Sequence, residues 1–161
     1  MTVTALRKEQ GLTLIELVIA LAILSVLAAA VLPMAEVTVK RGKEIELRRS
    51  LRIVRTAIDD YKADFDKAVQ QKKIIASISD TGYPDSLETL LEGNDWGGLY
   101  PYRKKYLRRI PRDPFDRYEE GWGLRSLEDD PDTTVWGGDN IYDVYSQSEG
   151  LGLDGTPYNT W

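Results

Sequence analysis

An apolar run near the start of the chain constrains its fold more than any other feature. Residues 12–33 contain one ionisable side chain, Glu16, within an otherwise continuous stretch rich in Leu, Ile, Val and Ala. At a helical rise of about 1.5 Å per residue, the run spans the roughly 30 Å hydrocarbon core of a bilayer. We therefore expect a single membrane-spanning helix in contact with membrane lipid.

The segment before the run predicts its orientation. Residues 1–11 are polar and carry Arg7 and Lys8, whereas the run contains no basic residue. Basic residues next to a membrane helix tend to stay on the cytoplasmic side. The N-terminus is thus expected in the cytoplasm, and everything after the run is expected to be exported.

The composition excludes several classes of function. The chain has 161 residues, no Cys, no His and a net charge of −5. It therefore has no means of forming a disulfide, a thiolate zinc site or a Ser-His-Asp triad. The acidic pairs at 59–60 and 129–130 are interpreted as solvated charges, so no enzymatic activity is expected.

The carboxylate of Glu16 is costly in lipid, by about 3 kcal/mol, unless it is neutralised or paired. No basic residue lies in the run, so its cationic partner would be a new α-amino group created by cleavage just before Leu12. Two simpler interpretations stay open: a secretory signal cut near residues 28–30, and an uncleaved signal anchor.

The sequence from Gly11 to Glu16 closely resembles the class III signal of type IV pilins and pseudopilins. It follows a short basic leader and precedes an apolar helix, as in that family. The resemblance implies that a prepilin peptidase cleaves between Gly11 and Leu12 and methylates the new N-terminus. It also implies that Glu16 neutralises the terminal amine of a neighbouring subunit during assembly, and that Pro33 bends the helix.

Beyond the run, residues 36–69 continue with helical periodicity. An apolar stripe recurs at spacings of three and four: Leu47, Leu51, Val54, Ile58, Tyr61 and Phe65. The stripe predicts either a coiled-coil seam or, as we prefer, a face that packs on the protein's own sheet. The opposite face is basic: Lys40, Arg41, Lys43, Arg48, Arg49, Arg52 and Arg55.

The composition changes after residue 73, where Gly, Pro, Tyr and Trp become frequent. A capping-box pattern at 85–88 and a glycine at 93 predict a short helix over 86–92. Aromatic and β-branched residues predict strands at 122–127 and 141–145. Two prolines make the segment 110–115 an extended turn.

Parts of this region are similar to the major, G-type pseudopilins of type II secretion systems. The similarity lies in Tyr83-Pro84, in Leu107 with residues 109–115, and in the terminal Trp161. It implies an α+β, pilin-like fold in which a long N-terminal helix has an apolar membrane half and an amphipathic half packed on a small antiparallel sheet. The expected divisions are a cleaved leader (1–11), a transmembrane and filament-core helix (12–35), an amphipathic helix (36–73) and a C-terminal globular domain (74–161).

The same resemblance implies a function and a set of partners. The chain would polymerise with itself into a periplasmic pseudopilus that drives protein export across the outer membrane. Its partners would be the prepilin peptidase, an inner-membrane assembly platform and minor pseudopilins. It would reside in the inner membrane as a single-pass protein with its C-terminal domain in the periplasm. The alternatives are a type IV pilin, major or minor, of a surface fibre and a membrane-anchored exported binding module.

Many G-type pseudopilins bind calcium in a C-terminal loop, so calcium is a possible ligand here. Residues 151–155 resemble the start of that loop, and would place a Leu151 carbonyl and the Asp154 carboxylate at the ion. The acidic cluster that follows in the family is absent from this chain. Calcium takes six to eight oxygen ligands, so the alternative is that these glycine-rich residues only form turns.

The segment 100–109 mixes basic and aromatic residues, as nucleic-acid-binding surfaces do. Residues 118–161, however, are strongly acidic, and the resulting field would oppose nucleic acid. No nucleic-acid partner is therefore expected. We interpret the basic surfaces at 40–55 and 103–112 as contacts for the acidic C-terminal surfaces of neighbouring subunits.

Overall fold

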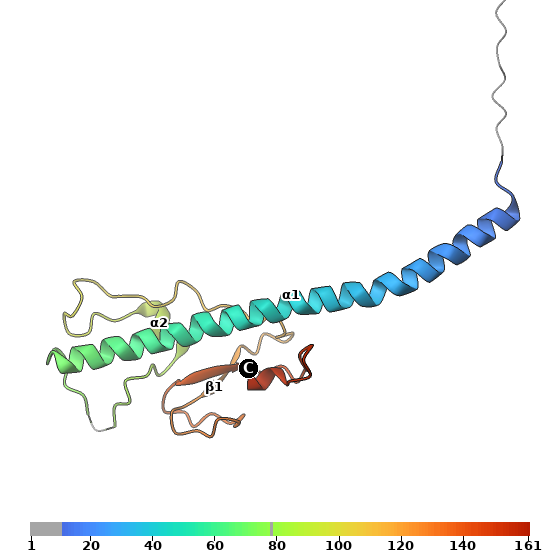
Figure 1. Cartoon of the computed structure of the whole chain (residues 1–161). Coiled ribbons are helices and arrows are strands. Elements are labelled where there is room, and N and C mark those ends of the chain that lie inside the picture. The colour runs from blue at the N-terminus through green and yellow to red at the C-terminus, as the bar shows by residue number, and fades with distance from the viewer. Residues whose placement is uncertain (1–10, 78) are drawn as a thin grey trace, which may run out of the picture. The chain divides into compact units, whose positions relative to one another are not determined.

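A computed structural model describes residues 11–77 and 79–161, so the predicted leader lies, except for Gly11, outside the described residues. The elements in chain order are helix α1 (Leu14–Gln70), helix α2 (Leu87–Glu92), strand β1 (Trp122–Arg125), strand β2 (Asp143–Ser146) and the 3-10 helix η1 (Tyr158–Thr160) (Figure 1). One long helix with a small antiparallel sheet confirms the predicted α+β class.

The chain divides into two compact units, with the boundary between Val39 and Lys40, and α1 contributes to both. In the first unit the described large apolar side chains of α1 are exposed, for example Leu14 at 84% and Met34 at 72%. Within the described residues, α1 is the one helix whose length and composition suffice to cross a membrane. A helix that leaves so much apolar surface uncovered needs lipid or other helices around it.

Pro33 lies inside α1. Its ring supplies no N–H for the carbonyl oxygen of Ala29 one turn earlier, which weakens the helix at this point. Thr38, one turn later, donates its hydroxyl to the carbonyl oxygen of Met34 at 2.9 Å. The bend at Pro33 stays a prediction.

The second unit is built on the amphipathic part of α1. Of the predicted stripe, five residues are at least 92% buried and Phe65 is partly buried. They belong to one core with Leu90 of α2, Trp122 of β1 and Val144 of β2. The stripe therefore packs on the protein's own C-terminal region, as preferred from the sequence, and does not form a coiled-coil seam in this chain.

Helix α2 lies within the predicted range. Its N-cap is Ser86, whose hydroxyl accepts from the backbone N–H of Thr89 at 3.4 Å, so the cap lies one residue after the first residue of the predicted capping box. The helix ends at Gly93, with a φ of 75°. A Cβ at Gly93 would lie 2.3 Å from the carbonyl oxygen of Lys104, so glycine is required where these two segments cross.

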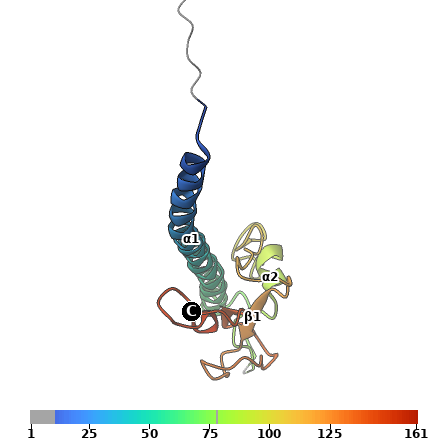
Figure 2. The same ribbon diagram turned by 90° about the vertical axis from the view of Figure 1, so that its right-hand side faces the viewer.

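Strands β1 and β2 form an antiparallel pair in which Trp122 faces Ser146 and Arg125 faces Asp143. The predicted first strand is two residues too long, because the backbone N–H of Ser126 donates to the Asp129 carboxylate at 2.7 Å and turns the chain. The predicted second strand starts two residues too early and ends one residue too early. The chain then returns to α1, and its C-terminal end lies beside that helix in both views (Figures 1 and 2).

Candidate functional site

The predicted processing site lies just before the first turn of α1. Gly11 and Leu12 are non-helical and exposed. Thr13 caps the helix, because its hydroxyl oxygen accepts from the backbone N–H of Glu16 at 3.2 Å. The Gly11–Leu12 bond therefore lies in an exposed, non-helical peptide immediately ahead of the helix, which is the form in which a peptidase can bind a substrate chain.

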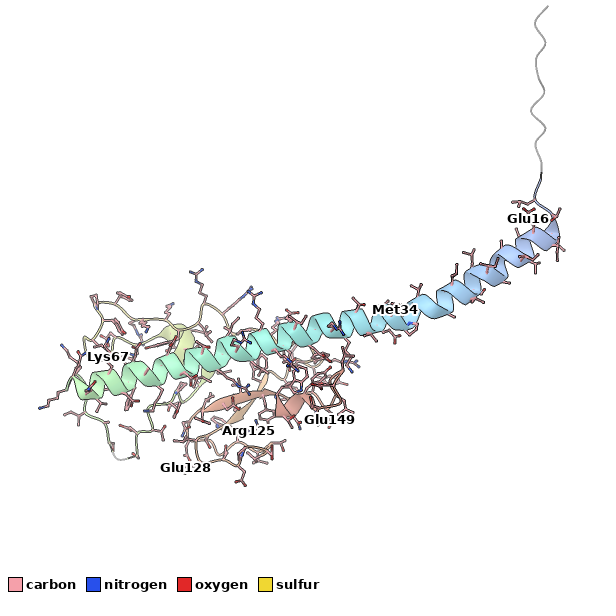
Figure 3. The ribbon with its side chains drawn as sticks, viewed as in Figure 1. Glu16, Met34, Lys67, Arg125, Glu128 and Glu149 are labelled. Atoms are coloured by element: carbon pink, nitrogen blue, oxygen red, sulfur yellow. The ribbon has the colours of Figure 1, made fainter. Side chains whose placement is uncertain are left out.

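Glu16 lies in the first turn of α1 (Figure 3). Its carboxylate there interacts favourably with the partial positive charge of the helix N-terminus. Among the residues that the structure describes, no cation pairs with it. The other polar side chain of the apolar run beyond the first turn, Ser25, bonds to the carbonyl oxygen of Leu21 at 2.8 Å. Glu16 is thus the one ionisable side chain of residues 12–33, and in an apolar surrounding it needs a charged partner.

The second unit divides the predicted basic residues of α1, at positions 40–55, into two sets. Arg55 bonds within the unit: its guanidinium donates to both carboxylate oxygens of Asp143, at 2.6 and 3.2 Å. It also donates to the carbonyl oxygens of Val144, at 3.0 Å, and Trp161, at 2.7 Å. Arg55 therefore ties α1 to β2 and to the C-terminal end.

Arg48 also turns toward the C-terminal segment. It lies 3.4 Å from the Asp154 carboxylate and its guanidinium stacks 4.0 Å from the centre of the Trp161 ring. The remaining arginines of the stretch 40–55 are exposed, namely Arg41, Arg49 and Arg52. None of these three forms an ion pair within residues 11–77 and 79–161.

The loop predicted to bind calcium is held by α1. Glu44 accepts from the backbone N–H of Leu153 at 2.7 Å and from the hydroxyl of Tyr158 at 3.1 Å. Burial and this hydrogen bond raise the pKa of Tyr158 to about 12. The loop is closed by a bridge between Leu151 and Pro157.

The residues around Asp154 are a poor fit for calcium. One Asp154 oxygen accepts from the backbone N–H and the hydroxyl of Thr156, at 3.0 and 2.6 Å, and the other faces Arg48. These contacts lower the pKa of Asp154, first through the Thr156 hydrogen bonds. No cluster of three or more metal-ligating side chains occurs in the described part of the chain. The Arg48 guanidinium already balances the charge of Asp154, so the geometry of the described residues favours the alternative in which Leu151 and Asp154 belong to a loop that only forms turns.

Sequence reasoning missed a buried charge cluster at the far end of α1. Asp64 is 6% exposed and accepts from the hydroxyls of Tyr100 and Tyr106, at 2.8 and 2.7 Å, and from the ammonium of Lys104 at 2.6 Å. Burial alone would raise the pKa of Asp64, but the hydrogen bonds from Lys104, Tyr106 and Tyr100 outweigh it and lower this pKa. The indole of Trp96 donates to Tyr106 at 2.7 Å and extends the cluster.

This cluster changes the interpretation of the basic and aromatic segment 100–109. Tyr100, Lys104 and Tyr106 all point to Asp64, so they are engaged inside the unit. Arg103, Lys105, Arg108 and Arg109 of the segment are exposed. The signal that could have revealed the cluster is the position of Asp64, which follows the apolar residues of the stripe at helical spacing.

Sequence reasoning also missed Arg125, which is 6% exposed. It donates to the carbonyl oxygens of Thr133, at 2.9 Å, and Asn159, at 3.1 Å, and stacks 4.1 Å from the centre of the Tyr145 ring. Because Arg125 is the one basic residue among the acids of residues 118–161, its isolation in the sequence was the available clue.

Comparison with known proteins agrees with the N-terminal geometry. Residues 6–32 match the family model for the prokaryotic N-terminal methylation motif. The match spans the predicted processing site and the apolar part of α1 as far as Leu32, so the predicted resemblance to the type IV pilins and pseudopilins is confirmed.

A second comparison, which covers most of the chain, finds one particular relative. The chain is 29% identical over 143 residues to the type II secretion system core protein G of Pseudomonas aeruginosa, covering 83% of this chain and 98% of the relative. No solved structure gave a significant match. Both similarities are to proteins of structural, pilin type, so the chain is not classed as an enzyme.

Proposed function

We propose that this chain is a major pseudopilin of a type II secretion system. In this proposal a prepilin peptidase removes residues 1–11 and methylates Leu12. The processed subunit waits in the inner membrane with its C-terminal domain in the periplasm. An assembly platform then extracts it into a periplasmic filament, in which minor pseudopilins also take part, and the growing filament drives protein export across the outer membrane.

The observation that carries the proposal is the position of Glu16. It is the one ionisable side chain of the run 12–33, lies in the first turn of α1 and falls within the residues that match the methylation motif. The proposed cleavage before Leu12 would make Glu16 the fifth residue of the mature chain. A carboxylate in lipid costs about 3 kcal/mol unless it is paired. The new amine of Leu12 on a neighbouring subunit supplies a cation at the same depth, so assembly removes the cost that the monomer bears.

The uncovered surface of the first unit supports the same proposal. Its large apolar side chains are exposed along the length of the helix, including Leu14, Ile23 and Val31. When subunits leave the bilayer, this surface is covered only if helices of identical chains bundle together. The similarity of most of the chain to a type II secretion core protein favours a pseudopilus over a surface fibre.

The test compares Glu16→Val with Ser25→Ala in the full chain, each produced together with a prepilin peptidase and an assembly system. Both variants keep the apolar run, and Ser25→Ala removes only a hydroxyl that bonds to Leu21. Mass spectrometry should find that both mature chains begin at N-methylated Leu12. Electron microscopy should find filaments for Ser25→Ala and almost none for Glu16→Val.

Three results would contradict the proposal. A mature chain that starts at any residue other than methylated Leu12 would remove the cation that Glu16 requires. Normal filaments from Glu16→Val would show that the carboxylate is not needed. Filaments that extend beyond the outer membrane in the native host would reassign the chain to a surface pilus.

A further inference from the structure

The side of α1 that faces away from the core combines positive charge with exposed apolar surface. Five residues share this side, with spacings of three or four apart from the adjacent Arg52 and Ile53, and we call them the basic face: Arg41, Ile45, Arg49, Arg52 and Ile53. Ile45 is 65% exposed and Ile53 is 41% exposed. Within the described residues, no ion pair engages the three arginines, so the face presents unsatisfied charge beside uncovered isoleucines.

A second surface of the same unit carries negative charge, and it too combines charged side chains with exposed apolar ones. Residues 127–136, which we call the acidic loop, expose Glu128, Asp130 and Asp132. Two apolar side chains flank these acids, Leu127 at 46% and Val135 at 75% exposure. No ion pair engages the three acids in the part of the chain that the structure describes.

The acidic loop is held in shape by bonds that leave those three acids free. Asp129 accepts from the backbone N–H groups of Ser126, at 2.7 Å, and Gly137, at 3.1 Å. Arg125 donates to the carbonyl oxygen of Thr133 at 2.9 Å, and the Tyr145 hydroxyl donates to that of Thr134 at 3.1 Å. A loop that is already ordered loses little entropy when it binds a partner.

The basic face and the acidic loop lie on different sides of the unit. The basic face points away from the core, whereas Glu128 lies at the loop beyond the β1–β2 pair, away from α1 (Figure 3). A contact between two unlike surfaces of one chain is heterologous, and repeating it generates a helical filament unless the rotation closes a ring. Three arginines facing three carboxylates, with apolar side chains on both sides, are complementary in charge and in character.

From this placement we infer that the acidic loop of one copy docks on the basic face of α1 of a second copy. The inference rests on the proposed self-assembly and names the surfaces that meet outside the apolar helices. Arg48 and Arg55 take no part in it, because they hold the C-terminal segment of their own chain. Glu16 pairs with the terminal amine of a neighbouring subunit in the membrane, and the contact between the acidic loop and the basic face then fixes the register between the two subunits.

The test is a charge exchange in the full chain under filament-forming conditions. Arg49→Glu with Arg52→Glu, and separately Asp130→Arg with Asp132→Arg, should each reduce the mass of sedimentable filaments at least tenfold. Combining all four substitutions should restore the yield to within about threefold of the unsubstituted chain. Arg117→Glu is the matched control, because Arg117 is exposed and forms no ion pair within the described residues.

Several outcomes would overturn the inference. Unchanged yield from either double substitution would do so, as would a fourfold variant that assembles no better than the doubles. Loss of binding to vesicles of anionic lipid by the arginine variant alone, with no effect of the loop variant, would assign the face to a membrane. Tryptophan fluorescence of each variant checks that its fold is intact.

Cross-linking separates this inference from the proposed function. The chain contains no Cys, so one introduced thiol on each of two differently tagged copies reports a single contact. Arg49→Cys with Asp130→Cys should give several times more disulfide-linked heterodimer than Arg117→Cys with Asp130→Cys. If the unsubstituted chain formed no filaments, the proposed function would fail, and this heterodimer in membranes would still decide whether the two surfaces meet.

Discussion

The Asp64→Asn substitution removes a buried charge that three side chains contact. An amide presents one acceptor oxygen in place of two, so its NH₂ group replaces either the oxygen that accepts from Tyr100 or the oxygen that accepts from Tyr106 and Lys104. Removing one partner of a buried ion pair costs about 3–5 kcal/mol. The side chain of Lys104 is 33% exposed and can regain water, so we expect a smaller loss of about 2–3 kcal/mol.

The expected shift of the melting temperature follows from the size of the unit. Unfolding entropy is about 2.1 cal/mol/K per residue, and the Lys40–Trp161 unit has roughly 120 residues. Each kcal/mol then corresponds to about 4 °C, and Asp64→Asn should lower the midpoint by about 8–12 °C. Fluorescence of the full chain in detergent can follow this transition, because Trp96, Trp122, Trp136 and Trp161 all lie in this unit.

The dependence on pH gives the prediction a second readout. The pKa of Asp64 is lowered in the fold, so the cluster stabilises above the unfolded value of about 3.9 and loses this effect as the pH falls further. The pKa of Lys104 is raised, so its contribution is present below about 10.5 and is lost as the pH rises beyond it. The difference in melting temperature between the unsubstituted chain and Asp64→Asn should be constant from about pH 5 to 9 and should become smaller below about pH 4.

The matched control is Asp66→Asn. Asp66 also lies on α1 and pairs with Lys62, but its side chain is 58% exposed. An exposed pair of this kind contributes at most about 1 kcal/mol. If Asp64→Asn and Asp66→Asn shifted the midpoint equally, or if the difference between the unsubstituted chain and Asp64→Asn did not become smaller in acid, the proposed importance of the buried cluster would be refuted.

Two further predictions concern backbone packing and metal binding. A Cβ at Gly123 would lie 2.2 Å from the Tyr145 ring, so Gly123→Ala should destabilise the unit by about 1–3 kcal/mol. Gly42 has open space around it on α1, so Gly42→Ala should stabilise by up to about 1 kcal/mol. Thermal unfolding measures both changes, and changes of the same sign would contradict the packing argument. The Asp154 carboxylate is already satisfied by Thr156 and Arg48, so the melting temperature in millimolar calcium should equal that in EDTA. Titration of calcium into the metal-free protein should release no heat beyond that of dilution. A clear rise of the melting temperature, or a clear heat of binding, would establish a calcium site there.

The features that were predictable from the sequence are those that depend on local spacing. Leu47, Leu51, Val54 and Ile58 recur every three or four residues, and no folded arrangement other than a helix places them on one buried side. The short helix α2 and the two strands were located by turn residues and by β-branched and aromatic side chains. Their ends were less certain, because they depend on single hydrogen bonds such as that from Ser126 to Asp129.

The partners of charged side chains were not predictable, because they depend on contacts between distant residues. Arg55 meets Asp143 across 88 positions of the sequence, and Lys104 meets Asp64 across 40. Nothing in the neighbouring residues distinguishes Arg55 from Arg52, which lies one turn earlier and forms no ion pair among the described residues. Only the return of the C-terminal segment to α1 makes the distinction.

This division of the arginines limits how assembly mutants of the chain can be interpreted. Arg55 and Arg49 both belong to the basic stretch 40–55, yet Arg55 anchors β2 and the C-terminal end, whereas Arg49 faces solvent. A charge reversal at Arg55 would place two carboxylates together and destabilise the unit, so a loss of filaments would follow even if neighbouring subunits never touched that residue. Reversal at Arg49 breaks no bond within the described chain. Among the basic residues of this stretch, only substitutions at outward positions such as Arg49 therefore separate assembly from folding.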